Sequence, residues 1–378
     1  MSATSDEIRV TAKRPRRGFA LPLAILALAL ITAAVAASSA STRAEIIANQ
    51  AVRAQDRAYQ LAEAGLQTFM SQRGLGLSCS NCVTNPGTSS ADSEWTRVSL
   101  TGGYADVAAI RLRPYIADTM PALFFVKSRG VDTTLKMSGT GLTVYPERIV
   151  GQYATFRTAS MKIVAAWVAL GGVTKSGSTS AISGADECGV QDSVAGVTVP
   201  IGEYRTSGST PAPIGKPAGV STMSASALKA LIGIDWNAII NNDAIPADNT
   251  IPTNGWPGSS WRVTRIKQAS YTIPSDGNGI LIADGNVTFP GSRDFDGIIL
   301  VGGQILGTGS QPSSGVVYSG LNYLLPGAAS PPASSTDDAT IASSKSVRYN
   351  SCNVATALAL LNNYFAWSNT WLDNVAIW

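Results

Sequence analysis

The stretch Arg16-Arg17-Gly18-Phe19-Ala20-Leu21-Pro22-Leu23 joins a basic leader to a long apolar segment. Residues 1–18 contain five Lys or Arg against two acidic residues, whereas the next 19 residues, Phe19 to Ala37, carry no charge. A helix needs roughly 20 apolar residues to span a bilayer, and positive residues keep their end of such a helix in the cytoplasm. The stretch therefore predicts a single membrane helix with its basic end in the cytoplasm and the rest of the chain outside it.

The helical pattern continues well beyond the apolar segment. Apolar or small residues recur at steps of three and four, namely Ile47, Ala51, Ala54, Ala58, Leu61, Ala62, Gly65, Leu66 and Phe69. No proline follows Pro22 in this region, and Gly74 and Gly76 are typical of a helix end. We expect one helix over residues 19–74, about 80 Å long at roughly 1.5 Å per residue.

Two other interpretations of the apolar segment compete with this one. It could be a secretory signal cleaved in the Ala/Ser run from Ala33 to Ser41, or a plain membrane anchor. Neither needs a helix that continues far past the apolar residues. The unbroken periodicity therefore argues against both.

The basic leader, the Gly18–Phe19 junction and the long helix make the chain similar to the type IV pilin superfamily. Within it, Ala62-Glu63-Ala64-Gly65-Leu66 resembles the motif that ends the helix of PilX-type minor pilins. The resemblance is strong over about the first 70 residues and loose over the remainder. It implies that a prepilin peptidase cleaves between Gly18 and Phe19, and that Phe19 becomes the N-methylated end of the mature chain.

The resemblance also implies that the helix packs against other subunits. Small residues let helices approach closely in lipid. The expected helix-packing positions are Leu23, Ala27, Leu30, Ala34, Glu63 and Gly65. Most pilins have Glu as the fifth residue after the cleavage site, where this chain has Leu23. In the family, subunits without this Glu tend to be minor ones, so Leu23 indicates a minor or tip subunit.

The composition argues against an enzyme and against a nucleic-acid-binding protein. The 378 residues include no histidine, and the net charge is only +3. Without histidine no Ser/His or Cys/His nucleophile can be assembled, and outside the leader the chain lacks a basic field for nucleic acid. We expect no catalytic residues, no cofactor, no metal site and no nucleic-acid partner.

The four cysteines lie in the part expected outside the cytoplasm, where disulfides persist. They are Cys79, Cys82, Cys188 and Cys352, and they allow three connectivities. We favour Cys79–Cys82 and Cys188–Cys352, because the first two share one short loop and the other two each border a structured block. A redox pair or half a zinc site at Cys79–Cys82 is the alternative, but no second CxxC accompanies it.

The remainder of the chain predicts an α+β protein with a β-rich head. The many Gly, Ser and Thr residues favour strands and turns, and residues 75–170 are expected to form an antiparallel, pilin-like sheet packed on the helix. The expected strands are Trp95–Leu100, Tyr104–Leu112, Ala122–Gly130 and Tyr153–Ala169.

Residues 171–378 are expected to form a second β-rich domain that contains a repeat. Gly279-Ile280-Leu281-Ile282 is echoed 18 residues later at Gly297 and 18 residues after that at Gly315, and a weaker copy stands at Val168–Val173. A short fixed period of strands and Gly turns predicts a β-solenoid-like stack, with an antiparallel meander as the alternative.

Two helices are expected within this second domain. Residues 189–270 are interpreted as an insertion into the repeat, with a helix near Ser224–Ile232 that Ser224 caps. Helical spacing of apolar residues predicts a C-terminal helix over Val354–Phe365.

Turn residues of the repeat offer two further hypotheses. Asp284, Asn286, Asp294 and Asp296 could bind calcium, but their spacing matches no known calcium loop, and solvated turns are the favoured interpretation. Trp236, Trp256 and Trp261 lie in or beside loops, where they could contact a partner or a glycan. The favoured interpretation is that they close the ends of the β core.

Together these features predict a minor pilin-like subunit of a type IV pilus, incorporated at or near the tip to prime assembly, to display a binding surface, or both. The alternatives are a tip pseudopilin of a type II secretion system and a membrane-tethered adhesin or glycan-binding module. The expected partners are other pilin and minor pilin subunits, inner-membrane lipid, a prepilin peptidase and a surface glycan. The expected location is the inner membrane with the head in the periplasm, and the exterior of the cell after assembly.

Overall fold

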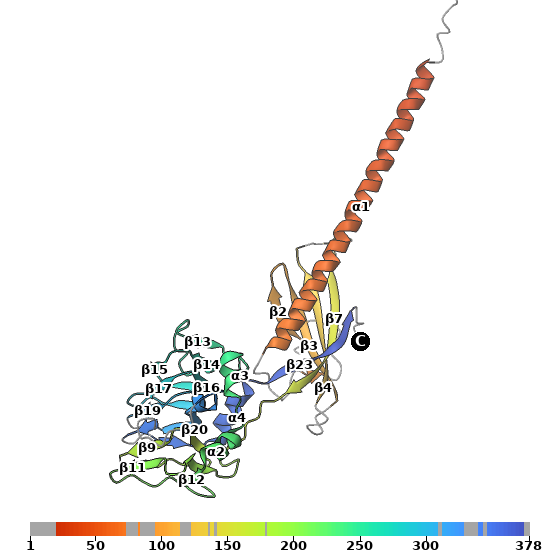
Figure 1. Ribbon diagram of the computed structural model, residues 1–378. Helices are drawn as coiled ribbons and strands as arrows, with labels where there is room; N and C mark the ends of the chain where they lie inside the picture. Colours follow the sequence, from red (N-terminus) through yellow and green to blue (C-terminus); the bar gives the residue numbers. More distant parts are fainter. Residues whose placement is uncertain are drawn as a thin grey trace, which may run out of the picture.

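The computed structural model describes residues 20–72, 82–83, 95–113, 122–134, 137–139, 142–177, 180–308, 312–328, 339–342 and 346–373. These residues form a long helix, a sheet packed on its C-terminal half, and a larger β-rich unit beyond the C-terminal end of the helix (Figure 1). The fold is therefore α+β, with a long N-terminal apolar helix and a β-rich body.

Helix α1 runs from Ala20 to Ser71, which is 52 residues or about 78 Å. Pro22 falls in its first turn, where backbone amides have no intrahelical acceptor, so the missing N–H costs no hydrogen bond. The buried positions begin at Ala54 and recur every three or four residues, at Ala54, Ala58, Leu61, Ala62, Leu66, Phe69 and Met70. Only this second half of the helix packs on the body. The expected end signals Gly74 and Gly76 lie outside the described residues.

A mostly antiparallel sheet, the head sheet, covers that half of α1. Its strands are β1 (Cys82–Val83), β2 (Thr96–Leu100), β3 (Gly103–Arg113), β4 (Leu123–Asp132), β7 (Glu147–Arg157) and β23 (Asn363–Asp373). The order is β1-β3-β4-β7-β23, with β2 beside β3, and a separate hairpin joins β5 (Met137–Gly139) to β6 (Leu142–Val144). Strands β2, β3 and β4 agree with three of the strands expected from the sequence.

Aromatic side chains fill the space between α1 and the head sheet. The Phe69 ring of α1 stacks on Tyr364, with ring centroids 5.6 Å apart. Tyr364 also meets Phe124 and Phe156 edge-on, each at 5.2 Å. Such pairs contribute beyond the apolar area that they bury. Because Tyr364 belongs to β23, the last strand in the described part of the chain completes the core that α1 begins.

Small residues let the helix and the sheet come close together. Gly65 of α1 lies against Ala105 and Ser128, and Gly130 of β4 lies against the backbone of Ala58 and Ala62. A Cβ atom added at either glycine would overlap these atoms. The Ala-Glu-Ala-Gly-Leu stretch thus gives α1 the flat surface on which the sheet rests.

The larger unit contains two sheets whose strands pair in parallel. The strands are β8 (Ala165–Ala169), β9 (Val173–Ser176), β10 (Ala195–Pro200), β11 (Tyr204–Ser207), β12 (Val220–Met223), β13 (Asn249–Ile251), β14 (Trp261–Ile266), β15 (Ser270–Thr272), β16 (Gly277–Ala283), β17 (Asn286–Phe289), β18 (Phe295–Val301), β19 (Ile305–Gly307), β20 (Pro312–Ser319), β21 (Ala339–Ile341) and β22 (Ser346–Arg348). The first sheet has the order β12-β10-β8-β20-β18-β16-β14-β13, with β22 beside β20, and the second has the order β11-β9-β21-β19-β17-β15.

The 18-residue spacing seen in the sequence is the register between neighbouring strands. Gly279, Gly297 and Gly315 lie side by side across β16, β18 and β20. Their φ angles of 115°, 121° and 146° favour glycine, and a Cβ atom there would overlap the backbone of the adjacent strand. The pairing is parallel, so these strands do not form the antiparallel meander that was the alternative.

The strands do not follow chain order through the first sheet, and the structure shows no closed solenoid. Strand β8, the weak upstream copy of the repeat, lies between β20 and β10. Strands β10, β12, β13 and β14 all come from residues 189–270. The segment interpreted as an insertion therefore contributes four strands to this sheet.

Two further segments differ from the sequence predictions. The expected strand Tyr153–Ala169 is broken at residues 158–164, so that β7 stays in the head sheet while β8 joins the larger unit. The expected helix Val354–Phe365 is α4 (Ser351–Ala359) followed by β23, which pairs with β7. In both segments, pairing with strands distant in sequence overrides the local apolar spacing.

Short helices cover one side of the larger unit (Figure 1). Helix α2 (Ala225–Ile232) agrees with the prediction, since the Ser224 hydroxyl accepts from the Ala227 amide at 3.2 Å and Gly233 ends the helix at φ 63°. Helix α3 (Trp236–Asn241) follows directly, capped by Asp235, and was not predicted. A 3₁₀ turn, η1 (Leu321–Leu324), follows β20.

A disulfide and a carboxylate fix the loop at residues 183–191 to the start of α4. Cys188 pairs with Cys352 across 164 residues, as favoured from the sequence. The Asp186 carboxylate accepts hydrogen bonds from the Ser351 hydroxyl at 2.7 Å and the Ser351 amide at 2.8 Å. Burial alone would raise the pKa of Asp186, but these bonds and those from the Gln191 and Cys188 amides outweigh it and lower the pKa to about 2. Cys79 lies outside the described residues.

The change Gly65→Ala tests the contact between α1 and the head sheet. Alanine is the better helix former by about 1 kcal/mol, but the added methyl would overlap Ala105. We expect the free energy of unfolding to fall by about 1–3 kcal/mol, measured by chemical denaturation of the full chain in detergent micelles. The control is Thr68→Ala, an exposed position in the same turn, which should be neutral or slightly stabilising. Equal effects at the two positions would contradict the overlap.

The change Asp186→Asn tests the hydrogen bonds between Asp186 and the start of α4, through the pH dependence of stability. The folded pKa of about 2 lies below the ordinary 3.8, so the carboxylate stabilises the fold above about pH 4, and this contribution is lost as the pH falls toward 2. The melting temperature of the variant should therefore lie below that of the wild type at pH 7, and the gap should close between pH 4 and 2. Asp192→Asn, at an exposed position nearby, should show no such gap. A gap at Asp186 that stays constant with pH would count against this role.

Candidate functional site

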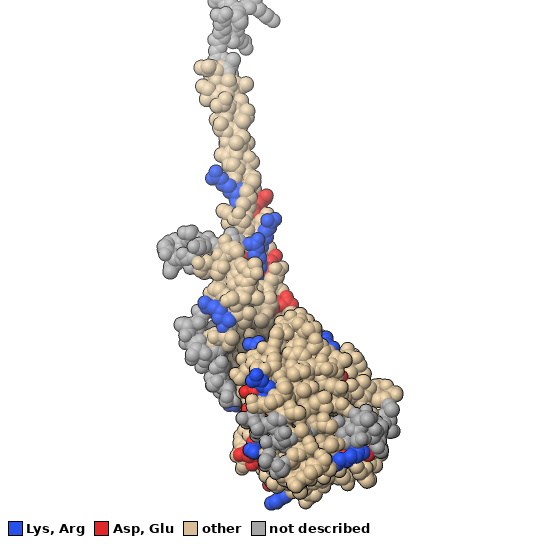
Figure 2. Space-filling model, turned by 90° about the vertical axis from the view of Figure 1, so that its left-hand side faces the viewer, with Lys and Arg blue, Asp and Glu red and all other residues tan. Residues whose placement is uncertain are grey.

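The N-terminal half of α1 stands clear of the body. Every residue from Leu21 to Gln50 is exposed, and the first charged residue of the helix is Arg43. The 23 uncharged residues before it span about 35 Å, more than the roughly 30 Å hydrocarbon core of a bilayer. We call this exposed N-terminal half of α1 the rod. Figure 2 shows that its uncharged part carries no Lys, Arg, Asp or Glu, and that the charged side chains begin nearer the body. By length and composition, α1 could cross a membrane.

Four of the five hydroxyl side chains of the rod, those other than Ser41, bond to the helix itself. The hydroxyls of Thr32, Ser38, Ser39 and Thr42 each donate to a backbone carbonyl three or four residues earlier, at 2.9–3.0 Å. In a hydrocarbon environment an unpaired hydroxyl is costly. These internal bonds make the rod as compatible with lipid as its composition suggests.

The expected helix-packing residues fall into two groups. Leu23, Ala27, Leu30 and Ala34 are exposed and, at steps of four, three and four, share one face of the rod. Glu63 and Gly65 lie where α1 meets the head sheet. Glu63 is half-buried and accepts a hydrogen bond from Gln67, while Gly65 is buried under the sheet of its own chain. The cleavage-site residues Gly18 and Phe19 lie outside the described residues.

A second candidate site is a cavity at the corner where the two sheets of the larger unit meet, which we call the corner cavity. It has a volume of about 380 Å³ and is open to solvent. Its walls are the turns that follow β8, β18 and β20, with Asn286 from the start of β17. A Cβ atom at Gly302 or Gly303 would overlap the amide side chains of Asn322 or Asn286, so these glycines are required by the tight corner.

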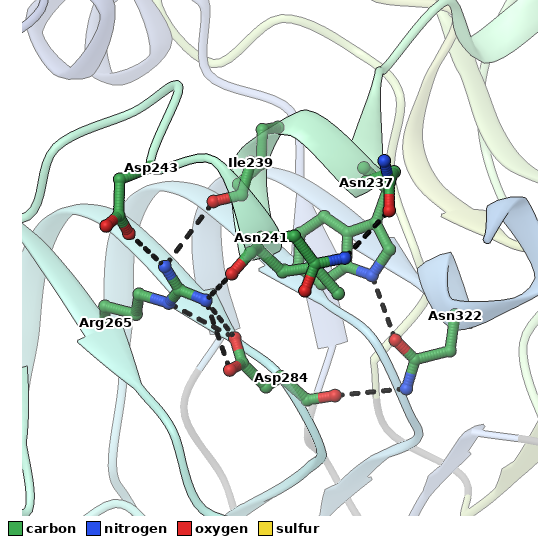
Figure 3. A network of polar contacts seen from close by, with 9 residues as sticks. Asn237, Ile239, Asn241, Asp243, Arg265, Asp284 and Asn322 are labelled. Carbon is green, nitrogen blue, oxygen red and sulfur yellow. Dashed lines mark hydrogen bonds and ion pairs between the residues drawn. The ribbon is translucent and has the colours of Figure 1, made fainter. Parts of the chain in front are cut away.

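A buried arginine, Arg265, holds α3 beside this corner (Figure 3). The Arg265 guanidinium, 4% exposed, pairs with Asp243 at 2.6 Å and with Asp284 at 3.3 Å. It also donates to the carbonyls of Ile239 and Ile240 at the end of α3, groups that a helix leaves without intrahelical partners. Arg265 therefore joins α3 to the turn that follows β16.

The same network fixes one wall of the corner cavity. Asn322 of η1 accepts from the Trp236 indole at 2.9 Å and donates to the Asp284 carbonyl at 3.0 Å. Both ends of its amide group are therefore held, and Figure 3 shows it between α3 and the turn of β16. Sequence reasoning missed this residue and the cavity, although the Gly-Gly turns were a signal that the backbone comes close together there.

The candidate calcium ligands do not converge on one point. Asp284 pairs with Arg265, Asn286 accepts from the Gln304 amide, and Asp294 accepts from the Phe295 amide. Burial, with nearby Glu187 adding to it, raises the pKa of Asp296. Among the residues that the structure describes, no three His, Cys, Asp or Glu side chains are grouped to hold a metal ion. Asp284 and Asp294 lie in turns and Asn286 begins β17, whereas Asp296 lies within β18 and is half-buried, so it is not the solvated turn residue that the favoured interpretation expected.

The three loop tryptophans pack into the body. Trp236 is fully buried, and Trp256 stacks on Tyr271 and donates to the Asp276 carbonyl. Trp261 is half-buried at the start of β14. Their packing against the β core agrees with the favoured interpretation, although Trp256 and Trp261 keep part of their surface exposed.

Comparison with known proteins adds little. No model of a protein family matches the chain, and no curated protein matches its sequence. Among solved structures, the competence-associated pilin ComZ from Thermus thermophilus overlaps 85% of this chain and 98% of its own, with 12% identity and a TM-score of 0.18. A TM-score this low carries no information on the fold or function of the chain.

The change Arg265→Met tests the network beside the corner cavity. It would leave two helix carbonyls and Asp284 without their buried donor, and we expect a loss of about 3–5 kcal/mol in the free energy of unfolding. Arg265→Lys should recover only part of it, because an ammonium cannot donate in all of these directions. Arg262→Met, at an exposed position of the same strand, should change stability by less than about 0.5 kcal/mol. Denaturation curves of the three variants measure this, and similar losses at both arginines would refute it.

Proposed function

We propose that the chain is a minor subunit of a type IV pilus, held in the inner membrane by α1 and assembled into the filament through that helix. The observation that carries the proposal is the uncharged half of α1, in which every residue from Leu21 on is exposed in the isolated chain. Apolar surface of this extent is rare on soluble proteins and marks contact with lipid or protein. Lipid would cover it before assembly, and the helices of other subunits would cover it afterwards.

The processing step of this proposal rests on sequence. A prepilin peptidase would cut between Gly18 and Phe19, and Phe19 would then be N-methylated. In the mature chain Leu23, Ala27, Leu30 and Ala34 would face neighbouring helices, where small side chains permit close packing. Leu23 in place of the usual Glu favours a minor position, and the Ala62–Leu66 motif favours the PilX-type group.

The disulfide supports the proposed orientation. The Cys188–Cys352 bond is stable in the periplasm or outside the cell and rare in the cytoplasm. The basic leader would stay in the cytoplasm by the positive-inside rule. The body would accordingly face the periplasm, and the exterior after assembly.

The shape of the molecule supports a place at or near the tip. The larger β-rich unit lies beyond the C-terminal end of α1, at the opposite end from the apolar segment (Figure 1), and in the proposed orientation it would point away from the membrane. In a bundle of parallel rods, this is the space that a subunit nearer the tip would take. Within the shaft the larger unit would therefore overlap the next subunit. At the tip no subunit follows, and the larger unit is free for contacts outside the filament. We propose no enzymatic activity for the chain, whose sequence contains no histidine.

The change Gly18→Leu tests the processing step. Since a bulky residue before the cut should block the peptidase, we expect the full-length chain to persist in the membrane and to be absent from sheared filaments. Mass spectrometry of the purified chain gives its first residue and its methylation, and immunoblots of sheared filaments give incorporation.

Ala12→Leu, a change of the same size within the leader, should be processed normally. A Gly18→Leu chain that is still shortened and incorporated would overturn the proposal. So would a wild-type chain that begins near Ser41, because the apolar helix would then be discarded.

A further inference from the structure

The corner cavity is lined without any charged side chain. It is lined by the turns 171–172, 302–303 and 319–320, with the Ser319 hydroxyl among them, and by Asn286, Gln304, Asn322, Tyr323 and Ala339. A charged ligand would lose its hydration there without gaining a counter-charge. An apolar ligand would strip water from the amide groups and return no hydrogen bonds. The lining therefore suits a ligand that is neutral and rich in hydrogen-bonding groups.

Two polar groups at the cavity have hydrogen-bonding capacity left. Ser319 is 2% exposed, and its oxygen accepts from the Trp167 indole at 3.0 Å, which leaves its O–H free to donate. The side-chain oxygen of Asn286 accepts from the backbone N–H of Gln304 at 2.8 Å. The NH₂ group of Asn286 has no acceptor in the described part of the chain. Both groups can donate to oxygen atoms of a ligand in the cavity.

The backbone around the cavity is already paired, which argues against an extended peptide. The amides of Gly302, Gly303 and Gly320 donate to the carbonyls of Ala283, Gly285 and Gly303 at 2.8–3.1 Å. Addition of a strand needs a row of unpaired backbone groups at a sheet edge, and these turns offer none at the three amides. Recognition in the cavity must therefore come from side chains and from the Tyr323 ring.

We propose that the corner cavity binds a neutral saccharide. Hydroxyl and ring oxygens would accept from Ser319 and Asn286, and one face of the sugar would lie on the half-buried Tyr323. The volume of about 380 Å³ is within the range of small-ligand sites and has room for one or two sugar rings. Asn322, held at both ends of its amide, keeps the wall in place before the ligand arrives. This inference is independent of the filament assembly proposed above.

The test is a titration of the purified full chain with defined sugars, in a detergent without a sugar headgroup. The probes are the methyl glycosides of glucose, galactose, mannose and N-acetylglucosamine, with glucuronic acid as the charged comparison. Saturation-transfer NMR detects binding, and calorimetry gives the dissociation constant, expected in the millimolar range for so small a ligand. At least one neutral glycoside should bind, and glucuronic acid should bind at least tenfold more weakly.

Variants place the binding in the cavity. Tyr323→Ser should weaken the bound glycoside about tenfold or more, whereas Tyr323→Phe, which keeps the ring, should change it less than threefold. Asn286→Asp retains the oxygen that accepts from Gln304 but replaces the donor with a charge, and should weaken binding about tenfold. Asn242→Asp adds the same charge at an exposed site outside the cavity, and should have no effect.

The melting temperature of each variant shows whether it has folded. The inference is overturned if no neutral glycoside binds the folded wild-type chain, or if glucuronic acid binds as well as the neutral probes. It is also overturned if Tyr323→Ser and Asn286→Asp fold and bind as the wild type does. None of these results would bear on leader processing or filament incorporation.

Discussion

The close contact between α1 and the head sheet determines how the rest of the molecule is held. Gly65 and Gly130 bring the helix backbone against β3 and β4, and aromatic rings from both sides fill the remaining space. Close packing at small residues leaves few alternative arrangements, because the partners cannot slide without overlap. The direction of the exposed rod relative to the body is thus fixed by a few contacts along a short part of one helix.

The larger unit is tied to this contact by two crossings of the chain. Residues 158–164 lead out of the head sheet, and residues 360–362 lead back into it. The two crossings are joined where the Ala159 amide donates to the Asn362 side chain at 3.0 Å. The first crossing is also fixed to the larger unit, because the buried Tyr318 hydroxyl of β20 donates to the Lys162 carbonyl at 3.2 Å. Since β23 completes the core under α1, a force on the larger unit reaches the rod through paired strands and not through a single linker.

Sequence patterns predicted the elements whose structure is set by interactions between residues close together in sequence or by a regular repeat. The continuous spacing of apolar residues predicted α1, Ser224 predicted the start of α2, and the 18-residue period predicted the register of β16, β18 and β20. Pairings between distant segments were not accessible in this way. Nothing in residues 363–373 indicates that they pair with β7, and nothing in residues 165–169 indicates that they lie between β20 and β10. The corner cavity was missed for the same reason, since its walls come from turns more than 100 residues apart.

The neutrality of that cavity depends on where the carboxylate beside it is used. Asp284 stands in the turn after β16, and its side chain pairs with Arg265 beside α3. This acidic group holds a helix end, and the residues that line the corner carry only backbone, amide, hydroxyl and aromatic groups. A site of this kind selects its ligand by the geometry of hydrogen bonds and by contact with a ring. Because salt screens only interactions between charges, such binding should vary little with ionic strength, unlike the attraction of a charged surface for a charged partner.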